Sequence, residues 1–234
     1  VVATSTPERV FPSSAVLLQN KLNIKNSFAF DVNAACTGFV FAIDIADKYI
    51  KNKSASNVLV VGAEKMSSLI DWKDRNTCVL FGDGAGAVIL SASESPGIIS
   101  STIGSNGSYK DLLTVNPDSD FIEMKGNDVF KIAVNTMGKL AKDTLNSNNL
   151  SIDQIDWLIP HQANSRIINA IAKKLSLSDD KIIMTVGNHG NTSAASIPLA
   201  VDYAHDNGTL KQDDMILLEA FGAGFTWGST LLKF

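Results

Sequence analysis

A repeat within the chain is the sequence feature that most constrains its fold. Residues 15–24 (AVLLQNKLNI) resemble residues 168–177 (INAIAKKLSL), and each segment leads into an apolar strand, a polar loop and a helix that begins on small residues. Cys36 lies at the first of these helix starts and Asn191 at the second. Any α/β protein alternates in a similar way, but the shared residues favour a duplicated α/β unit over a solenoid.

The hydrophobic pattern predicts alternating strands and helices along the whole chain. Short β-branched or aromatic runs predict strands, and longer runs of period 3.6 predict helices. We expect strands over residues 1–4, 28–32, 58–61, 77–81, 86–91, 157–160, 182–185, 215–218 and 229–233. We expect helices over residues 12–22, 36–50, 127–146, 165–175 and 192–206. Pro96-Gly97 marks the expected boundary between an N-terminal half, residues 1–96, and a C-terminal half, residues 97–234.

Composition narrows the class of protein. Apolar residues make up 45% of the chain, enough to bury a core, and the formal net charge of −4 gives no indication of a nucleic-acid partner. No apolar run reaches the ~18 residues of a transmembrane helix, so we expect no membrane partner, and no signal peptide is visible. The two cysteines, Cys36 and Cys78, lack metal-ligand spacing, so we expect no metal site and a reducing, cytoplasmic compartment.

Cys36 is the candidate nucleophile. It lies in the run DVNAACTGF at residues 31–39, after a predicted strand and at the start of a predicted helix. Backbone N–H groups at a helix start favour thiolate over thiol, so this position is expected to lower the pKa of the cysteine. A buried, inert cysteine is the alternative. That alternative is the preferred interpretation of Cys78, which lies in the apolar run at residues 77–81.

His161 and Asn191 are the candidate partners of Cys36. His161 lies in the run PHQAN at the end of a predicted strand, where ligands collect in α/β proteins. Of the other two histidines, we expect His205 on the surface and His189 in a loop-shaping role. Asn191 lies in the run GNTSAAS, where a helix N-cap is the default interpretation of an asparagine.

Two glycine-rich segments have different predicted roles. The run FGDGAG at residues 81–86 lacks the G-x-G-x-x-G spacing and the following helix of a nucleotide-binding loop, so we interpret it as a tight turn between two strands. The run EAFGAGF at residues 219–225 follows a predicted strand and offers unhindered backbone N–H groups, which suit an oxyanion site. A plain glycine turn is the alternative for this second run.

Together these segments resemble the ketoacyl-acyl-carrier-protein synthase III family. Four motifs carry the resemblance in the same order, namely residues 31–39, PHQAN with Arg166, residues 190–196 and residues 219–228. The resemblance spans residues 1–234 and implies an α/β fold, the thiolase-like duplicated α-β-α-β-α sandwich. It also implies an acyltransferase that forms an acyl-Cys intermediate. This enzyme would condense an acyl-coenzyme A primer with malonyl-acyl-carrier protein, with loss of carbon dioxide, to initiate fatty acid biosynthesis.

The resemblance implies a role for each candidate residue. Cys36 would accept the acyl group, while His161 and Asn191 would hold the extender thioester and stabilise its enolate. The backbone N–H groups of Cys36 and Ala223 would form the oxyanion hole, although relatives carry a third glycine in place of Ala223. The coenzyme A and phosphopantetheine channel would be lined by Arg75, Asn164, Arg166, Met124, Gly126, Phe130 and Phe221. The acidic carrier protein would dock on Lys131, Arg166, Lys173 and Lys174, and the acyl pocket of the neighbouring subunit in a homodimer would be gated by Phe11.

The resemblance also implies coenzyme A thioesters as substrates, no resident cofactor, and a further N-terminal segment in family members. We therefore expect the first half to be truncated, the strand at residues 1–4 to lack a neighbour, and the chain to be less soluble and less active without that segment. A papain-like hydrolase also uses Cys, His and Asn in this order, but its local cysteine motif is missing here. A non-catalytic polyketide subunit is a second alternative, against which the retention of all three polar residues argues.

Overall fold

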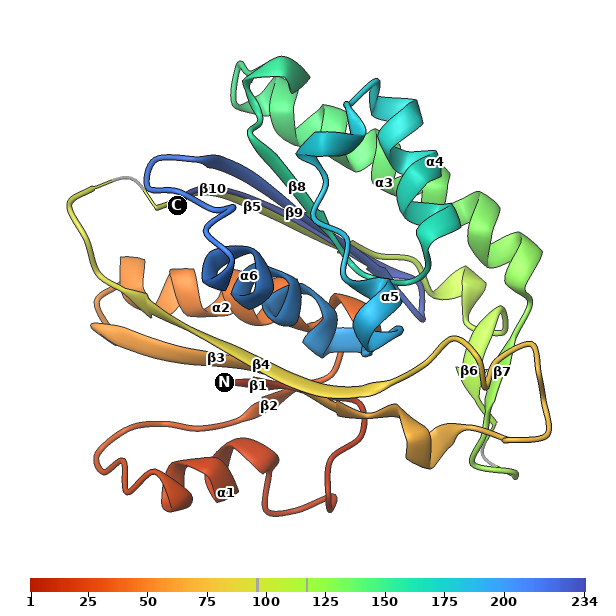
Figure 1. Ribbon diagram of the computed structural model, residues 1–234. Coiled ribbons are helices and arrows are strands. Elements are labelled where there is room, and N and C mark those ends of the chain that lie inside the picture. The colour runs from red at the N-terminus through yellow and green to blue at the C-terminus, as the bar shows by residue number, and fades with distance from the viewer. Residues whose placement is uncertain (96, 117) are drawn as a thin grey trace.

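The computed structural model describes residues 1–95, 97–116 and 118–234, and its elements form five layers (Figure 1). The layers are an outer helix α1, a first sheet, the central helices α2 and α6, a second sheet, and the outer helices α3 and α4. These helices are α1 (Ser14–Lys21), α2 (Gly38–Lys51), α3 (Gly126–Ser147), α4 (Ser165–Leu175) and α6 (Ser196–Asp206). The α-β-α-β-α order confirms the predicted sandwich. Pro96, the first of the two residues at the expected boundary, lies outside the described residues.

The first sheet has the strand order β2-β1-β3-β4. Its strands are β1 (Val2–Ala3), β2 (Asp31–Val32), β3 (Asn57–Lys65) and β4 (Asp83–Ser91). β1 lies between β2 and β3 and is parallel to both, while β4 is antiparallel to β3. The prediction that the strand at residues 1–4 lacks a neighbour is wrong, because both of its edges are paired. Within the described residues, the free edges of this sheet are the outer edges of β2 and β4.

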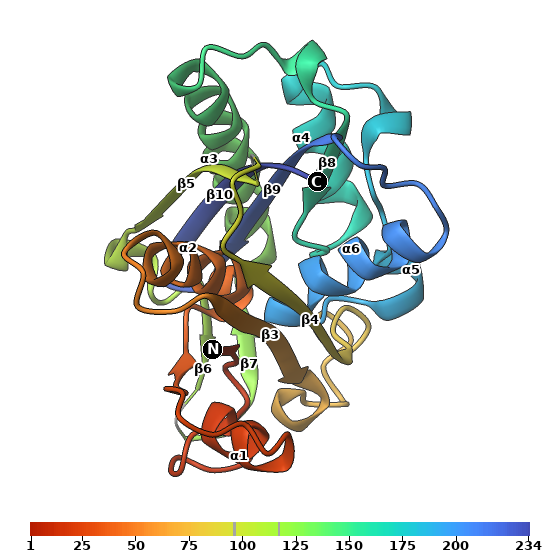
Figure 2. The same ribbon diagram turned by 90° about the vertical axis from the view of Figure 1, so that its left-hand side faces the viewer.

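The second sheet has the strand order β5-β10-β9-β8. Its strands are β5 (Ile98–Ser105), β8 (Trp157–Pro160), β9 (Met215–Gly222) and β10 (Thr226–Lys233). β8 is parallel to β9, whereas β10 is antiparallel to both β9 and β5. Figure 2 shows α2 and α6 side by side between the two sheets. A separate hairpin of β6 (Leu113–Val115) and β7 (Ile122–Met124) precedes α3.

The two halves repeat one order of elements, which supports the duplication. The order in the first half is β1, α1, β2, α2, β3 and β4. The order in the second half is β8, α4, a β-bridge at Ile182, α6, β9 and β10. The match extends to a loop, where Asn33 Oδ1 accepts the Ala35 N–H and Asn191 Oδ1 accepts the Ser193 N–H. Ala35 and Ser193 also share a left-handed backbone, with φ of 47° and 49°. Asn33 is therefore the counterpart of Asn191.

The FGDGAG run is not a tight turn, because β4 begins within it. Its glycines alternate along the chain, and each lies where a side chain has no room. A Cβ added at Gly84 would lie 2.8 Å from Leu199 Cδ1, and one at Gly86 would lie 2.9 Å from Leu199 N. A Cβ at Gly82 would collide with the carbonyl oxygen of His189. The glycines therefore allow this segment to lie flat against α6 and the loop before it.

Two other predicted strands are wrong. Residues 77–80 form turns around Asp74, whose backbone oxygen accepts the Cys78 N–H at 3.0 Å, and Cys78 is only half-buried. Residues 182–185 make a single bridge, between Ile182 and Leu158. A strand needs a partner for its backbone, and local apolar character alone does not supply one. The run at residues 77–80 is not buried either, because Val79 is 67% exposed. The strands β5, β6 and β7 were not predicted, and β5 is rich in serine, threonine and glycine.

The central layer joins the two halves into one core and positions the site. The largest buried apolar cluster includes Phe39 and Ile43 of α2, Ile197 of α6, and Ile216 and Leu218 of β9. The two central helices lie side by side, with their N-terminal ends at the same end of the layer (Figure 1). A Cβ at Gly38, the first residue of α2, would lie 3.4 Å from the Cβ of Ala194, which lies two residues before the start of α6. Cys36 precedes α2, and Asn191 precedes α6.

Candidate active site

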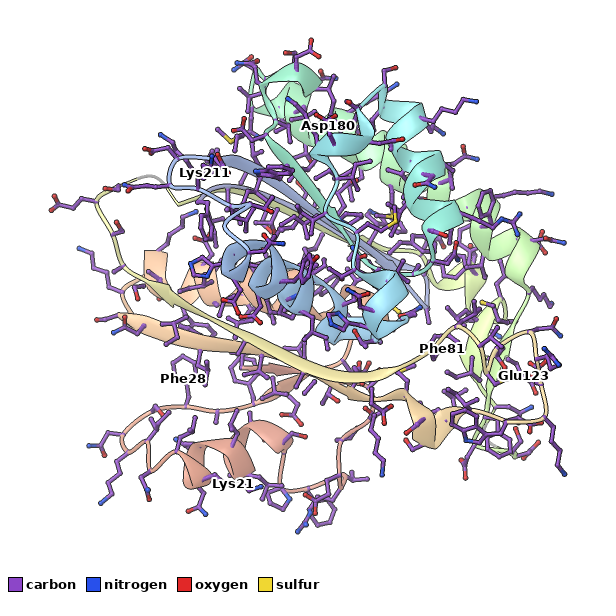
Figure 3. All side chains as sticks on the ribbon, in the orientation of Figure 1. Lys21, Phe28, Phe81, Glu123, Asp180 and Lys211 are labelled. Atoms are coloured by element: carbon purple, nitrogen blue, oxygen red, sulfur yellow. The ribbon has the colours of Figure 1, made fainter. Side chains whose placement is uncertain are left out.

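One cavity brings together Cys36, His161 and Asn191. It has a volume of about 880 Å³ and is lined by residues from both halves of the chain. Phe81, which also lines it, is labelled in Figure 3 on the side of the molecule where α5 (Val186–His189) and the β6–β7 hairpin lie. The structure therefore places the three predicted catalytic residues together, although they are far apart in sequence.

Cys36 lies in a short 3-10 helix, η1 (Ala35–Thr37), directly before α2, and is 7% exposed. Burial raises the pKa of its thiol to about 12, and the charge of Glu64 acts in the same direction. The hydroxyl of Ser193 and the backbone N–H of Cys36 lower the pKa by smaller amounts. The prediction of a lowered pKa is therefore wrong, because the loss of water around the sulfur outweighs the effect of the helix start. The sulfur is a protonated thiol at neutral pH.

His161 follows β8 and is 4% exposed. Its Nδ1 lies 2.7 Å from Ser196 Oγ, and that oxygen accepts the Gln162 N–H at 3.3 Å. Among the described residues the Ser196 hydroxyl has no acceptor other than Nδ1, so it donates to Nδ1 and leaves the ring proton on Nε2. Burial lowers the pKa of His161 to about 4, so the ring is neutral at neutral pH. His161 is thus equipped to donate an N–H.

Gln162 holds the end of β8 in place, a role that was not predicted. Its Nε2 donates to the backbone oxygens of Pro160 and Ile183 at 2.7 and 3.1 Å. Its Oε1 accepts the N–H groups of Thr185 and Val186 at 2.7 and 3.1 Å. All polar atoms of a buried amide are therefore paired, which fixes the backbone beside His161. The sequence feature that could have indicated this role is the position of Gln162 directly after His161 in the run PHQAN.

Asn191 is held by its backbone and by its side chain. Its N–H donates to Leu80 O at 2.8 Å, and its own backbone oxygen accepts the Gly82 N–H at 3.0 Å. Asn191 Oδ1 accepts the Ser193 N–H at 2.9 Å, which resembles the N-cap interpretation. That bond fixes the orientation of the amide. In the described part of the chain, Nδ2 has no protein acceptor, so its N–H groups are available to a bound substrate.

The predicted oxyanion-hole residues lie on segments that touch. A Cβ at Gly222, the last residue of β9, would lie 2.9 Å from Cys36 N and 3.1 Å from Thr37 N. Glycine therefore lets the end of β9 reach the amide of Cys36. Ala223 follows in the turn, and its N–H meets no protein acceptor among residues 1–95, 97–116 and 118–234. Ala223 is not among the residues that line the cavity, so an oxyanion hole built from the Cys36 and Ala223 N–H groups stays a prediction.

Most predicted channel residues line the cavity, namely Met124, Gly126, Phe130, Asn164, Arg166 and Phe221. The guanidinium of Arg166 lies 5.7 Å from the centroid of the Phe130 ring, and Asn164 Oδ1 accepts the Ile167 N–H at the start of α4. Arg75 is not among the lining residues, although Asp74 and Asn76 on either side of it are. Phe11 is 82% exposed and also does not line the cavity.

Four cations form what we call the basic patch, consisting of Lys131, Arg166, Lys173 and Lys174. All four are exposed on α3 and α4, and Lys131 and Arg166 also line the cavity. Lys174 Nζ donates to Asn135 Oδ1 at 2.5 Å, which links the two helices. Within the described residues no carboxylate forms an ion pair with any of the four. Two of these unpaired cations, Lys131 and Arg166, thus lie at the cavity, and the other two lie in the last turn of α4.

Neither a metal-binding cluster nor a membrane-spanning helix occurs among the described residues. No group of three or more His, Cys, Asp or Glu side chains in this part of the chain is arranged to hold a metal ion. No helix among the described residues has the length and apolar character needed to cross a membrane. His205 is exposed beside Asp206, as predicted.

The fold and the cavity define a class of protein. A duplicated α-β-α-β-α sandwich with a cysteine from one half and a histidine and an asparagine from the other is the architecture of a thiolase-fold condensing enzyme. The chain matches the family described as 3-Oxoacyl-[acyl-carrier-protein (ACP)] synthase III over residues 30–107, and the C-terminal family of the same description over residues 145–234. The chain belongs to the 3-oxoacyl-[acyl-carrier-protein] synthase III family and is an acyltransferase.

Individual relatives agree with this assignment. The chain is 54% identical over 245 residues to beta-ketoacyl-[acyl-carrier-protein] synthase III of Thioalkalivibrio sulfidiphilus, which covers 100% of this chain and 76% of the relative. It is 53% identical over 243 residues to the protein of the same name in Methylococcus capsulatus, with the same coverage. The crystal structure of 3-oxoacyl-[acyl-carrier-protein] synthase III from Aquifex aeolicus superposes with a TM-score of 0.97 at 46% identity, covering 100% of this chain and 76% of that one.

Proposed function

We propose that Cys36, His161 and Asn191 carry the reaction of this enzyme, the decarboxylative condensation of an acyl-coenzyme A primer with malonyl-acyl-carrier protein. The product is a 3-oxoacyl-acyl-carrier protein, and the reaction initiates fatty acid biosynthesis. The observation that carries the assignment of roles is the meeting of one thiol and two neutral N–H donors in a single cavity. A nucleophile serves the acyl transfer, and neutral donors serve the decarboxylation.

In the first half-reaction, Cys36 Sγ attacks the thioester carbonyl of acyl-coenzyme A. The negative charge that develops on the carbonyl oxygen is stabilised by the backbone N–H groups of Cys36 and Ala223. The contact between Gly222 and the Cys36 amide supports this assignment. Coenzyme A then leaves as a thiol, and the acyl group remains on Cys36. Coenzyme A thioesters are substrates in this scheme, and no resident cofactor takes part.

In the second half-reaction, malonyl-acyl-carrier protein loses carbon dioxide and its thioester becomes an enolate. Nε2–H of His161 and Nδ2–H of Asn191 donate to the enolate oxygen. A neutral imidazole suits this role because it donates without being consumed as an acid, and the lowered pKa of His161 keeps it neutral. The enolate carbon then attacks the acyl carbonyl carbon on Cys36, and the bond between that carbon and the Cys36 sulfur breaks. The product is released, and Cys36 leaves as a thiolate that takes up a proton.

A reconstituted reaction tests the proposed function. The purified chain is mixed with acetyl-coenzyme A and malonyl-acyl-carrier protein, and the carrier protein is analysed by intact mass spectrometry. We expect the mass of a 3-oxobutanoyl-carrier protein, together with a protein species acetylated on Cys36. Omitting acetyl-coenzyme A is the control and should remove both signals. Product formation with no acyl-protein at any time would contradict the covalent route.

The basic patch should dock the acidic carrier protein. We expect the triple charge reversal Lys131→Glu, Lys173→Glu and Lys174→Glu to raise the KM for malonyl-carrier protein by about tenfold or more, mainly through slower association. The KM for malonyl-coenzyme A, which lacks the protein, should change little. The matched control is the reversal of Lys25, Lys53 and Lys211, which are exposed, do not line the cavity and form no ion pair within the described residues. Equal losses with both donors would show that the patch does not dock the carrier.

We also propose that the enzyme acts in the cytoplasm as a homodimer in which Phe11 gates the acyl pocket of the neighbouring subunit. Val10 and Phe11 are adjacent, apolar and exposed by 89% and 82%. Such side chains are unfavourable in water and favour a protein partner. Neither side chain lines the cavity of its own chain, which supports a role toward a second chain.

A further inference from the structure

Glu64 is a buried carboxylate for which the proposed function has no role. It lies near the end of β3, is 6% exposed, and forms no ion pair within the described residues. The segment Thr4–Thr6 supplies most of its donors: Ser5 N and Ser5 Oγ lie 3.1 and 2.8 Å from Oε1, and Thr6 Oγ1 lies 2.6 Å from Oε2. Burying a charge without a counter-ion costs free energy that an apolar side chain would not, so its presence here points to a function.

One further donor to Glu64 comes from the other half of the chain. Ser193 Oγ donates to Glu64 Oε1 at 3.1 Å, and both side chains are buried. Gly62 allows this approach, because a Cβ there would lie 2.3 Å from the backbone oxygen of Ala194 in the 3-10 helix η6 (Ser193–Ala195). β3 is paired with β1 on one side and with β4 on the other, so the Ser193 hydroxyl is attached to the interior of the first sheet.

Ser193 also holds the amide of Asn191. The Ser193 N–H donates to Asn191 Oδ1 at 2.9 Å, which leaves Nδ2 as the end of the amide that can meet a substrate. Ser193 therefore bonds to Asn191 through its backbone and to Glu64 through its hydroxyl. A continuous set of hydrogen bonds runs from β3 to the amide that we assign to the enolate. Neither Glu64 nor Ser193 lines the cavity, so an effect of either on the enolate passes through Asn191.

The internal repeat shows what the Ser193 hydroxyl adds. In the first half, Asn33 and Ala35 form the same loop, with φ of 47° at Ala35 against 49° at Ser193. The loop therefore forms with alanine at this place, and its fold does not require a hydroxyl. The N–H to Oδ1 distance is 3.3 Å in the first copy and 2.9 Å in the second. The copy whose asparagine lines the cavity is the one with a hydroxyl anchored on a buried carboxylate.

We propose that Glu64, acting through Ser193, is a positioning residue that fixes the Asn191 amide for the decarboxylation step. A donor to an enolate oxygen must stay aligned while the charge develops, and a misplacement of about 1 Å can cost up to about a hundredfold in rate. Hydrogen bonds to a paired strand supply that alignment. Ser196, from the same run of sequence, holds the other donor, His161. The inference rests on the proposed function, in which Asn191 donates to the enolate.

A positioning role requires the acceptor oxygen of Glu64 and not its charge. Glu64→Gln keeps an oxygen that can accept the Ser193 O–H, whereas Glu64→Leu keeps a similar size and removes both acceptors. We expect Glu64→Leu to slow carbon dioxide release from malonyl-carrier protein by about tenfold, and Glu64→Gln to slow it by less than about threefold. A carboxylate that acted through its charge, or by taking up a proton, would fail in both variants.

The decisive experiment is a double-mutant cycle between Ser193 and Asn191 in the full chain, measured as carbon dioxide release from malonyl-carrier protein. Ser193→Ala is compared in the parent and in the Asn191→Ala background. Alanine fits the backbone conformation of Ser193, as Ala35 shows in the first half. Ser229→Ala is the matched control, because Ser229 is an equally buried serine that accepts the Thr144 hydroxyl at 3.0 Å and does not line the cavity.

We expect Ser193→Ala to slow carbon dioxide release by about tenfold in the parent but by less than about twofold in the Asn191→Ala background, because the support has no amide left to hold. Ser229→Ala should leave the rate close to that of the parent. Equal losses in both backgrounds, which a general loss of stability or an effect on the Cys36 thiol would produce, would overturn the inference, as would a parent-like rate for Ser193→Ala. If Glu64→Leu does not fold, the cycle decides the question alone. Release by Asn191→Ala as fast as by the parent would instead overturn the proposed function.

Discussion

Replacing Cys36 with alanine is expected to abolish formation of the acyl-enzyme and to reduce condensation by at least about a thousandfold. The reason is chemical, since no other thiol lines the cavity among the described residues. Acetyl-coenzyme A labelled in the acetyl group is incubated with the protein, and peptide mass spectrometry locates the label. Folding is followed by the thermal unfolding midpoint, which should stay close to that of the parent because alanine fits where cysteine was.

Cys78→Ser is the matched control for Cys36→Ala. Cys78 is half-buried in the turns before β4 and does not line the cavity. This variant should therefore acetylate and condense like the parent. A label found on Cys78 alone, or an active Cys36→Ala variant, would show that the nucleophile has been misassigned.

Replacing Asn191 or His161 with alanine should separate the two half-reactions. Each replacement removes one N–H donor to the enolate oxygen, and the loss of one such donor typically costs on the order of a hundredfold or more. We expect decarboxylation of malonyl-carrier protein to fall by that factor, whereas acetylation of Cys36 stays near the parent rate. Decarboxylation is measured as carbon dioxide release, and acetylation is measured by mass spectrometry in a single turnover.

Asn33→Ala is the control for the structural part of the Asn191 result. Asn33 Oδ1 accepts the Ala35 N–H just as Asn191 Oδ1 accepts the Ser193 N–H, but Asn33 does not line the cavity. Asn33→Ala therefore removes the equivalent loop bond without removing a donor to substrate. Parallel losses of acetylation and decarboxylation in Asn191→Ala would contradict the proposed division of roles.

Much of the fold was predictable because local pattern and tertiary environment agree. The predicted strand at residues 157–160 and helix at residues 165–175 match β8 and α4 residue for residue, and the helix predicted at 127–146 is α3 extended by one residue at each end. These segments carry strong periodicity and clear ends. The strand predicted around Cys78 is absent because no strand of the described residues pairs with that run. β5 was missed because its pairing with β10 compensates for weak local propensity.

The site was predictable in its membership but not in its chemistry. Cys36, His161 and Asn191 stand in distinctive local runs, so their types and order could be read directly. Glu64 had no such signal, because it is one acidic residue at the end of an apolar strand. Its hydrogen bond with Ser193 follows from the packing of β3 against the 3-10 helix η6 (Ser193–Ala195), and it joins residues more than a hundred positions apart.

The sequence by itself thus determined the duplicated α/β architecture, the boundaries of the strongly periodic elements and the residues that meet in the cavity. Periodicity and helix starts are properties of neighbouring residues, and a repeat is found by comparing two stretches of the sequence. All three are therefore visible without a structure. Only the tertiary structure decided the protonated state of Cys36, the neutral tautomer of His161 and the glycine face of β4 against α6. Each of these depends on how much water and which distant groups surround an atom, and folding alone brings those surroundings together.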